Sequence, residues 1–327
     1  MAKALLAQYD AVFADLDGVV YEGGKAIEHA VPALERVSEL GLKLAFVTNN
    51  SSRKPATIAD QLAGYGLKVS EDQVVSSGQT GVELLSTLIP AGSKVLVVGG
   101  EGLRTYTQAA GFTLVEDSTE NPAAVIQGFS PDVGWKQLSE AAFSIQNDAK
   151  WVATNQDWTI PQERGIAPGN GTLVSAVHTA VGQLPLVAGK PEVAIFNTAI
   201  RRTSAQRPLF VGDRIDTDIL GANRSGIDSL LVLTGISQAK ELLSVKADSQ
   251  PKFVVADLRE LHLPYEQPKQ TKYGFKLRGA EVELLGNKVR VITGDPKSID
   301  VLRCACKVIW NSGKAIHALD VDPEIYE

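Results

Sequence analysis

The stretch Ala11-Val12-Phe13-Ala14-Asp15-Leu16-Asp17-Gly18-Val19-Val20-Tyr21 guides the interpretation of the whole chain. Residues 11–14 are small or apolar, which is typical of a buried strand. Asp15 therefore falls at the carboxyl end of a strand, where open α/β sheets place their ligands. Gly18 has no Cβ, so the chain can turn back and let Asp15 and Asp17 face one point. Taken alone, the motif is equally compatible with a solvated acidic turn.

Three later stretches repeat this design, an apolar strand that ends on residues able to handle an anion or a metal. They are residues 44–47 before Thr48-Asn49-Asn50-Ser51-Ser52, residues 186–189 before Lys190-Pro191, and residues 209–212 before the acidic segment from Asp213 to Asp218. Carboxylates, a hydroxyl and amide cluster and a lysine together form the inventory of a site for phosphate and a metal ion. Helix capping is the alternative explanation for Asp213, Asp218 and Thr48.

The composition is that of an ordinary globular protein, with 44% hydrophobic and 21% charged residues. The length of 327 residues exceeds the roughly 250–300 at which single cores tend to split, so we expect at least two domains. The net charge of −6 argues against a general nucleic-acid-binding protein, which would show a basic face. No apolar run approaches the length of a membrane span, and Tyr9-Asp10 interrupts the weakly apolar start, so a cytoplasmic protein without a membrane partner is expected.

Strands and helices alternate along most of the chain, which predicts a doubly wound parallel sheet with right-handed crossovers. From about Gln79 the pattern restarts without acidic motifs. We therefore expect residues 80–185 to form an α/β domain inserted into a core made of residues 1–79 and 186–263. Within the insertion, residues 161–171 are expected to form a loop, which in a compact domain is usually functional or mobile.

The composition changes after Leu263, where a linker-like segment begins. Two stretches that alternate apolar and polar residues are joined by Gly286-Asn287, which predicts a β-hairpin. Asp295-Pro296 predicts the start of a helix that runs to about Asn311. Residues 264–327 are thus expected to form a small hairpin-plus-helix extension, too small for a core of its own. This extension could pack on the core, form a homodimer contact or bind an effector.

One other stretch offers an alternative chemistry. Gly99-Gly100-Glu101-Gly102 follows an apolar strand and opens a helical pattern, as a dinucleotide-binding turn would. The third glycine of that fingerprint is missing, because position 105 is threonine. An ordinary glycine turn between a strand and a helix is therefore favoured.

Taken in order, these stretches resemble the haloacid-dehalogenase superfamily of phosphohydrolases, closest to its class IIA branch of NagD-type, 4-nitrophenyl phosphate and pyridoxal phosphatases. The four matching motifs are Asp15-x-Asp17-Gly18, Thr48-Asn49-Asn50, Lys190-Pro191 and Gly212-Asp213-x-x-x-x-Asp218. The resemblance covers about residues 10–262 and implies a haloacid-dehalogenase-like α/β core whose inserted domain acts as a lid. The extension resembles, more weakly, an acetyltransferase fragment found on glycerol 3-phosphate phosphatases of this branch.

The resemblance implies a role for each motif. Asp15 would attack phosphorus and form an aspartyl-phosphate, and Asp17 would act first as the acid and then as the base. Mg²⁺ would be held by Asp15, Asp213 and the backbone carbonyl of Asp17, with Asp218 in support. Thr48, Asn49, Asn50 and Lys190 would bind the phosphoryl group, and Asn155, Asp157 and the loop 161–171 of the inserted domain would contact the substrate.

Simple electrostatics supports the metal. Each unit charge of a phosphate near 4 Å from the Asp15 carboxylate costs about 4 kcal/mol at an effective dielectric constant of 20. One lysine does not offset this repulsion, so a divalent cation is implied, and oxygen ligands indicate Mg²⁺.

We therefore expect a Mg²⁺-dependent phosphatase for a small phosphorylated metabolite, with glycerol 3-phosphate as the leading substrate. Phosphoglycolate, pyridoxal phosphate and sugar or nucleotide monophosphates are alternatives. A phospho-aspartate switch or binding module without turnover is a hypothesis of a different class. Asp17 argues against it, because a base beside the acyl phosphate should speed its hydrolysis.

Overall fold

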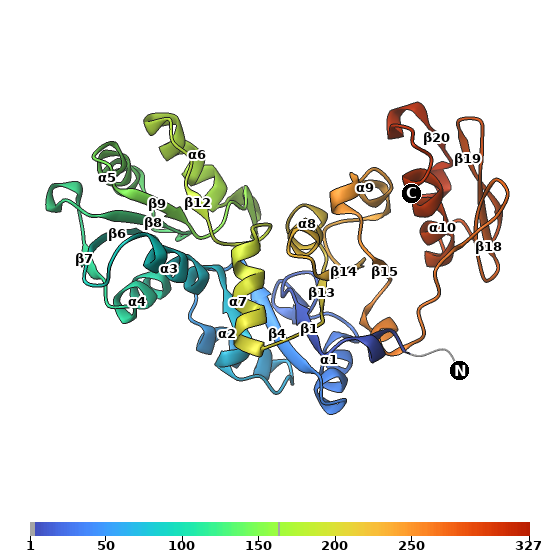
Figure 1. Cartoon of the computed structure of the whole chain (residues 1–327), viewed down its shortest axis with the longest axis horizontal. Helices are drawn as coiled ribbons and strands as arrows, with labels where there is room; N and C mark the ends of the chain where they lie inside the picture. Colours follow the sequence, from blue (N-terminus) through green and yellow to red (C-terminus); the bar gives the residue numbers. More distant parts are fainter. Residues whose placement is uncertain (1–3, 163) are drawn as a thin grey trace. The chain divides into compact units, whose positions relative to one another are not determined.

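The computed structural model describes residues 4–162 and 164–327. The chain forms two compact units, Met1–Leu42 with Arg207–Glu327, and Lys43–Gln206. Both contain parallel strands and helices, so the predicted α/β fold class is confirmed (Figure 1). In the described part of the chain, no helix has both the length and the apolar character that crossing a bilayer requires.

The first unit contains a parallel sheet with strand order β15-β14-β13-β1. The strands are β1 (Ala11–Ala14), β13 (Pro208–Gly212), β14 (Asp228–Val232) and β15 (Phe253–Val255). Every residue of β1 and β13 is buried, as expected for strands covered on both faces. The other elements are a short hairpin, β2 (Tyr21–Glu22) with β3 (Lys25–Ala26), and the helices α1 (Ala30–Glu39), α8 (Leu220–Arg224) and α9 (Ala239–Leu243).

The predicted extension forms a second sheet in the same unit, with strand order β16-β17-β18-β19-β20 (Figure 1). Its strands are β16 (Lys269–Gln270), β17 (Gly274–Leu277), β18 (Ala280–Leu285), β19 (Lys288–Thr293) and β20 (Asp320–Val321). The predicted hairpin is confirmed as β18 and β19, and Gly286 takes the positive φ of +64° that the turn requires. Helix α10 (Ile299–Trp310) starts later than predicted, because the hydroxyl of Ser298 caps it by accepting the N–H of Val301 at 3.3 Å.

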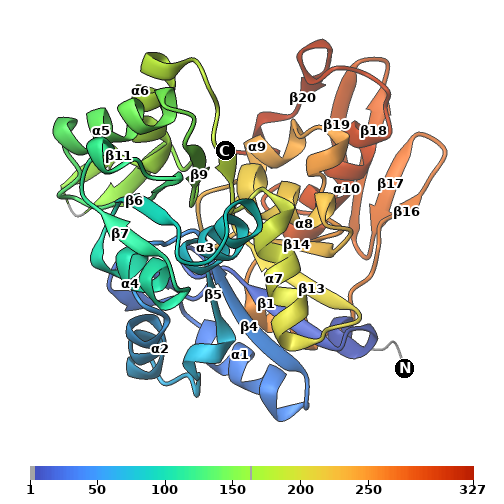
Figure 2. The ribbon, with the colours of Figure 1, turned by 60° about the vertical axis from the view of Figure 1, so that its left-hand side comes forward.

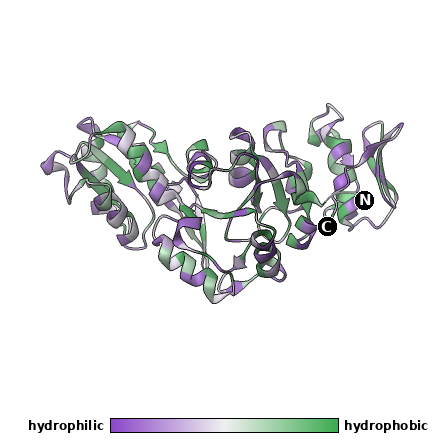
Figure 3. Cartoon of the chain, turned by 60° about the horizontal axis from the view of Figure 1, so that its bottom comes forward, coloured by the Kyte–Doolittle hydropathy of each residue, from purple (hydrophilic) through white to green (hydrophobic). Residues whose placement is uncertain are grey.

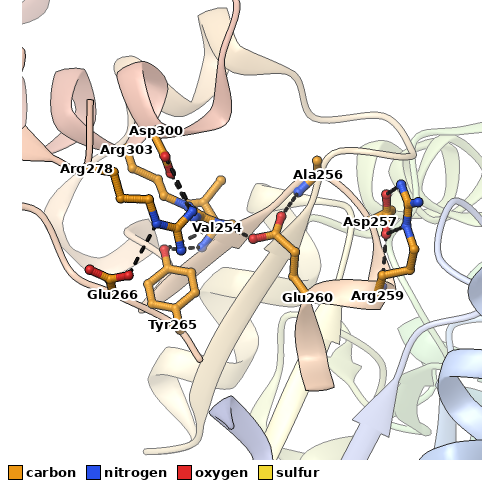
Figure 4. Close-up of polar contacts among 10 residues, drawn as sticks. All are labelled: Val254, Ala256, Asp257, Arg259, Glu260, Tyr265, Glu266, Arg278, Asp300 and Arg303. Atoms are coloured by element: carbon orange, nitrogen blue, oxygen red, sulfur yellow. Dashed lines mark hydrogen bonds and ion pairs between the residues drawn. The ribbon is translucent and has the colours of Figure 1, made fainter. Parts of the chain in front are cut away.

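The extension shares a hydrophobic core with the rest of its unit. One cluster of buried side chains combines Leu242, Leu243 and Val254 with Val301 and Leu302 of α10. A buried arginine on α10, Arg303, adds a polar contact, which Figure 4 shows with its partners. The extension is therefore an integral layer of this unit.

The second unit contains a parallel pair, β4 (Lys43–Thr48) with β5 (Val74–Ser76), and a five-stranded parallel sheet with strand order β12-β9-β8-β6-β7. The strands of the larger sheet are β6 (Lys94–Val98), β7 (Thr113–Val115), β8 (Ala124–Gln127), β9 (Lys150–Ala153) and β12 (Leu186–Val187). The helices are α2 (Pro55–Gly64), α3 (Ser77–Leu88), α4 (Glu101–Ala109), α5 (Trp135–Gln146), α6 (Asn170–Val181) and α7 (Val193–Thr203).

Alternation along β6 shows how the larger sheet is covered. Val95 and Val97 belong to one buried cluster with side chains of α3 and α4, whereas Leu96 and Val98 belong to another with side chains of α5 and α6. Successive side chains of a strand point to opposite faces, so helices cover both faces of this sheet (Figure 2). Colouring by hydropathy shows the strands as mainly hydrophobic (Figure 3).

Two details differ from the sequence-based expectations. Much of the predicted loop 161–171 belongs to an antiparallel ribbon, β10 (Thr159–Gln162) with β11 (Gly165–Pro168), followed by the start of α6. Pro168 is tolerated in β11 because a two-stranded ribbon has only edge strands. Strand β12 pairs with β9, so the larger sheet extends past the domain limit predicted at residue 185. The predicted domain limits stay predictions.

Candidate active site

Three buried carboxylates meet in the first unit. Asp15, Asp213 and Asp218 each offer one oxygen, and these oxygens lie within 4.8 Å of one another. Ala14 pairs with Val211 in parallel register, so Asp15 and Asp213 follow the same edge of the sheet. The side chains are 8%, 1% and 0% exposed, respectively. Buried carboxylates at this spacing suit a hard cation with oxygen ligands, which would compensate their charge.

Asp218 reaches this cluster through an unusual turn. Residues Ile215–Ile219 form a π-helical turn between β13 and α8. The carboxylate of Asp218 accepts the backbone N–H groups of Asp213 and Arg214, both at 3.1 Å. Asp218 therefore orders the main chain that carries Asp213, and the supporting role in catalysis stays a prediction.

Asp17 is placed differently from the other predicted acidic residues. Its side chain is exposed and accepts the hydroxyl of Tyr21 at 3.4 Å, outside the cluster of three carboxylates. Gly18 has φ +77°, and an ideal Cβ there would overlap the carboxylate of Asp213. Only glycine therefore fits this turn without displacing Asp213. The use of the Asp17 backbone carbonyl as a metal ligand stays a prediction.

The predicted phosphate-binding residues lie in the second unit. Thr48 ends β4, is buried, and accepts the N–H of Asn50 at 3.1 Å. The side chain of Asn50 accepts the N–H groups of Ser52 and Arg53, both at 3.1 Å, and so closes the loop before α2. Asn50 therefore has a structural role in this loop.

Asn49 holds the main chain at Lys190. Its Nδ2 donates to the carbonyl of Lys190 at 3.1 Å, and its Oδ1 accepts the N–H of Lys190 at 2.8 Å. Lys190 is 3% exposed, and the peptide bond between it and Pro191 is cis. The structure thus brings Asn49 and Lys190 together, although 141 positions separate them in sequence.

Asn155 and Asp157, predicted to contact the substrate, both contact Asn49. The Nδ2 of Asn155 donates to the Asn49 carbonyl at 2.8 Å, and the carboxylate of Asp157 accepts the Nδ2 of Asn49 at 3.0 Å. Asn170 lies in the stretch 161–171 that was also predicted to contact the substrate, and it is 0% exposed and donates to the Asn155 carbonyl at 2.8 Å.

One group escaped the sequence analysis, the segment that follows β14. The hydroxyl of Thr234 donates to the carbonyl of Gly18 at 2.7 Å, and the backbone N–H of Ser237 donates to the carbonyl of Asp213 at 3.0 Å. The segment therefore links the turn after β1 to the end of β13. Thr234-Gly235 directly after an apolar strand was the available signal.

The glycine-rich stretch at residues 99–102 is explained by packing. An ideal Cβ on Gly102 would lie 2.7 Å from the carbonyl oxygen of Ser52, and one on Gly99 would lie 3.0 Å from the side chain of Leu103. Gly102 thus allows α4 to approach the loop that follows β4, and Gly99 leaves room for the side chain of Leu103. Close packing thus accounts for them without a dinucleotide.

Comparison with known proteins agrees with this geometry. Residues 12–113 match the haloacid dehalogenase-like hydrolases, and residues 187–261 match a HAD-hydrolase-like family. The D-glycerol 3-phosphate phosphatase of Mycobacterium tuberculosis is 36% identical over 96% of this chain and 89% of its own length. An acid sugar phosphatase of Staphylococcus saprophyticus is 34% identical over 78% of this chain and 98% of its own length.

A solved structure extends the likeness to three dimensions. The crystal structure of the glycerol phosphate phosphatase of Mycobacterium tuberculosis in complex with magnesium has a TM-score of 0.88 and 35% identity, covering 98% of this chain and 95% of that one. The chain belongs to the haloacid dehalogenase-like hydrolases. Within that family it is a phosphatase of small phosphate monoesters, a phosphoric monoester hydrolase.

Proposed function

We propose that this enzyme hydrolyses glycerol 3-phosphate with Mg²⁺ as its cofactor. The observation that carries the proposal is the length of the match. The likeness to the glycerol 3-phosphate phosphatase spans 321 residues and therefore includes much of the extension. The likeness to the acid sugar phosphatase spans 258 residues, which is nearly all of that shorter protein.

The acidic cluster supports the choice of metal. Asp15 and Asp213 offer buried carboxylate oxygens, and Mg²⁺ prefers oxygen ligands. In this proposal they hold the ion together with the backbone carbonyl of Asp17, while Asp218 orders the main chain of Asp213. A bound Mg²⁺ supplies positive charge that reduces the repulsion between the substrate phosphate and the carboxylates.

The proposed reaction has two displacements at phosphorus. An Asp15 oxygen forms a bond to phosphorus while the ester P–O bond breaks, and Asp17 gives its proton to the leaving glycerol oxygen. A water molecule then attacks the phosphorus of the aspartyl-phosphate, and Asp17 takes a proton from it. Inorganic phosphate leaves, and the Asp15 carboxylate is restored.

The residues around Thr48 and Lys190 bind the phosphoryl group in this proposal. Thr48 offers its hydroxyl, Asn49 its backbone N–H, and Lys190 a positive charge that favours the transition state. Asn50 acts by closing the loop that carries Thr48 and Asn49. Asp157 stays a candidate for contact with the glycerol part. The predicted homodimer and the predicted cytoplasmic location stay predictions.

The test is release of inorganic phosphate from glycerol 3-phosphate. We expect sustained turnover with Mg²⁺, loss of turnover with EDTA, and loss of turnover in Asp15→Asn and Asp17→Asn. The matched control is Asp72→Asn, because Asp72 is an exposed carboxylate in the second unit. Phosphoglycolate, pyridoxal phosphate, and sugar and nucleotide monophosphates form the comparison panel.

Two outcomes would contradict the proposal. A higher kcat/KM for another monoester of the panel would replace the substrate but keep the reaction. A long-lived phosphoenzyme with no turnover on any monoester would replace the enzyme by a phospho-aspartate switch.

A further inference from the structure

We infer that Asn155 is a positioning residue, which fixes Asn49 and, through Asn49, the main chain of Lys190. The sequence suggested that Asn155 contacts the substrate, whereas its environment indicates that it acts through Asn49. The inference rests on the proposed function only where it assigns phosphate binding to Lys190. The contacts themselves all lie within the second unit.

Both polar atoms of the Asn49 side chain form hydrogen bonds. Its Oδ1 accepts the N–H of Lys190 at 2.8 Å, and its Nδ2 donates to the carbonyl of Lys190 at 3.1 Å and to the carboxylate of Asp157 at 3.0 Å. A primary amide has two N–H donors, so both are accounted for by these bonds. The amide of Asn49 therefore serves as a clamp on the peptide groups of Lys190.

The main chain of Asn49 is fixed from a different direction. Its carbonyl oxygen accepts the Nδ2 of Asn155 at 2.8 Å and the hydroxyl of Ser77 at 2.6 Å. These two donors saturate the two lone pairs of the carbonyl. The position of the clamp thus depends on where Asn155 and Ser77 hold the Asn49 peptide.

Asn155 is itself held rigidly. It is 4% exposed, its Oδ1 accepts the N–H of Asp157 at 3.2 Å, and its carbonyl accepts the Nδ2 of Asn170 at 2.8 Å. Asn170 is 0% exposed and belongs to the first turn of α6. A chain of hydrogen-bonded amides therefore runs from α6 through the buried Asn155 and the half-buried Asn49 to Lys190.

Close packing around Gly189 supports the same arrangement. An ideal Cβ on Gly189 would lie 2.5 Å from the Oδ1 of Asn49 and 2.6 Å from the carbonyl oxygen of Thr154. The segment before Lys190 thus approaches both Asn49 and the residue next to Asn155. We therefore expect a displacement of Asn155 to disturb the segment that carries Lys190.

The test uses Asn155→Ala and Asn155→Asp in the full chain. The aspartate has nearly the shape of asparagine, but a carboxylate replaces the donor that faces the Asn49 carbonyl. We expect kcat/KM to fall by about 10- to 100-fold in both variants, because small misplacements of a positioned group have effects of that size. KM and the inhibition constant of inorganic phosphate should rise together, since Lys190 is proposed to bind phosphate.

A second readout does not depend on activity. In protein labelled with ¹⁵N-lysine, the Lys190 amide is assigned by its absence from Lys190→Arg. Its resonance should shift, and its hydrogen exchange should become faster, in both Asn155 variants. Asn147→Ala is the matched control, because Asn147 is exposed at the end of α5. It should leave both readouts unchanged.

Unchanged phosphate inhibition together with an unchanged Lys190 resonance in the Asn155 variants would overturn the inference. If Asn155→Ala does not fold, Asn155→Asp alone carries the test, because it keeps the shape of asparagine without the donor to the Asn49 carbonyl. A wild-type chain that hydrolyses no monoester would overturn the proposed function alone, since the Lys190 resonance still tests the clamp.

Discussion

The backbone N–H of Ile236 donates to Oδ2 of Asp213 at 2.7 Å. A second main-chain bond, from Ser237 to the carbonyl of Asp213, fixes the same residue at 3.0 Å. The hydroxyl of Ser237 also accepts the N–H of Ile215 at 3.1 Å, at the start of the π-helical turn. The segment after β14 therefore sets the orientation of a proposed metal ligand without offering a ligand itself.

Gly235→Ala should weaken the binding of Mg²⁺. An ideal Cβ at this position would overlap the side chain of Asp213, so the carboxylate has to move. Residues that orient metal ligands typically change metal affinity or activity by about 10- to 100-fold when they are altered. We expect a rise of at least about tenfold in the Mg²⁺ concentration for half-maximal activity, with kcat at saturating metal less affected. This concentration is measured by following phosphate release at increasing concentrations of Mg²⁺.

The control for this variant is Gly279→Ala, which has nothing within 4 Å of its ideal Cβ. It should titrate as the wild type does. Identical Mg²⁺ curves for Gly235→Ala and the wild type would show that the Asp213 carboxylate is not part of the metal site.

Arg303→Met should destabilise the first unit. The guanidinium of Arg303 donates to the carbonyl of Val254 at 2.8 Å and to Glu260 at 2.6 Å, and it lies 4.4 Å from the ring centroid of Tyr265 (Figure 4). Its side chain is 2% exposed, so removal leaves a buried carbonyl and a carboxylate without their cation. We expect a loss of about 3 kcal/mol in the free energy of unfolding, measured by urea denaturation.

Arg290→Met is the comparison for Arg303→Met. Arg290 pairs with Asp320 in a more exposed position, where an ion pair contributes less than about 1 kcal/mol. Equal losses in the free energy of unfolding in the two variants would mean that burial does not increase the contribution of Arg303 to stability.

Truncation after Leu263 should yield an aggregating or poorly folded protein. The cut removes α10 and uncovers apolar side chains that the cluster now buries, among them Leu231, Leu242 and Val254. It also removes Tyr265, whose hydroxyl contacts the backbone of Val254. Solubility and thermal unfolding of the truncated chain measure this. A monomeric truncated protein with the thermal midpoint of the full chain would show that the extension is dispensable for folding.

His262 should make stability depend on pH in the weakly acidic range. Burial lowers its pKa from the usual 6.5, an effect that Arg36 reinforces, and its Nε2 donates to the carbonyl of Ala33 at 2.8 Å. The unfolded chain therefore binds a proton at a higher pH than the folded chain does. The stability contribution of the neutral ring is present above pH 6.5 and is lost as the pH falls through the lower folded pKa.

The test compares the wild type with His262→Gln, which retains an N–H donor. Between about pH 7 and pH 5 the wild type should lose stability relative to the variant. The difference should be less than about 1 kcal/mol, because the ring is only half-buried. Parallel stability curves across this range would contradict the expectation.

The sequence was most informative where function follows from the ends of parallel strands. Asp15 and Asp213 each follow an apolar strand, and adjacent parallel strands bring such residues to one edge. The third carboxylate could not be selected in this way. Asp218 reaches the cluster through a π-helical turn, whose period differs from the 3.6 residues that sequence patterns reveal.

The contacts made by buried polar side chains could not be predicted from the sequence either. The motif around Asn155 was recognised, but its local pattern does not show that the side chain points at a peptide group more than a hundred residues away. The start of α10 illustrates a smaller ambiguity. Asp295 and Ser298 are both suitable caps, and only the packed helix shows that Ser298 is used.

Asp213 lies between two glycines that come from different strand ends, Gly18 and Gly235, and a methyl group on either would strike its side chain. Mutation should therefore be tolerated as poorly at these two positions, which carry no chemistry, as at the carboxylates themselves. A saturation screen scored for phosphate release should rank these two glycines beside the carboxylates.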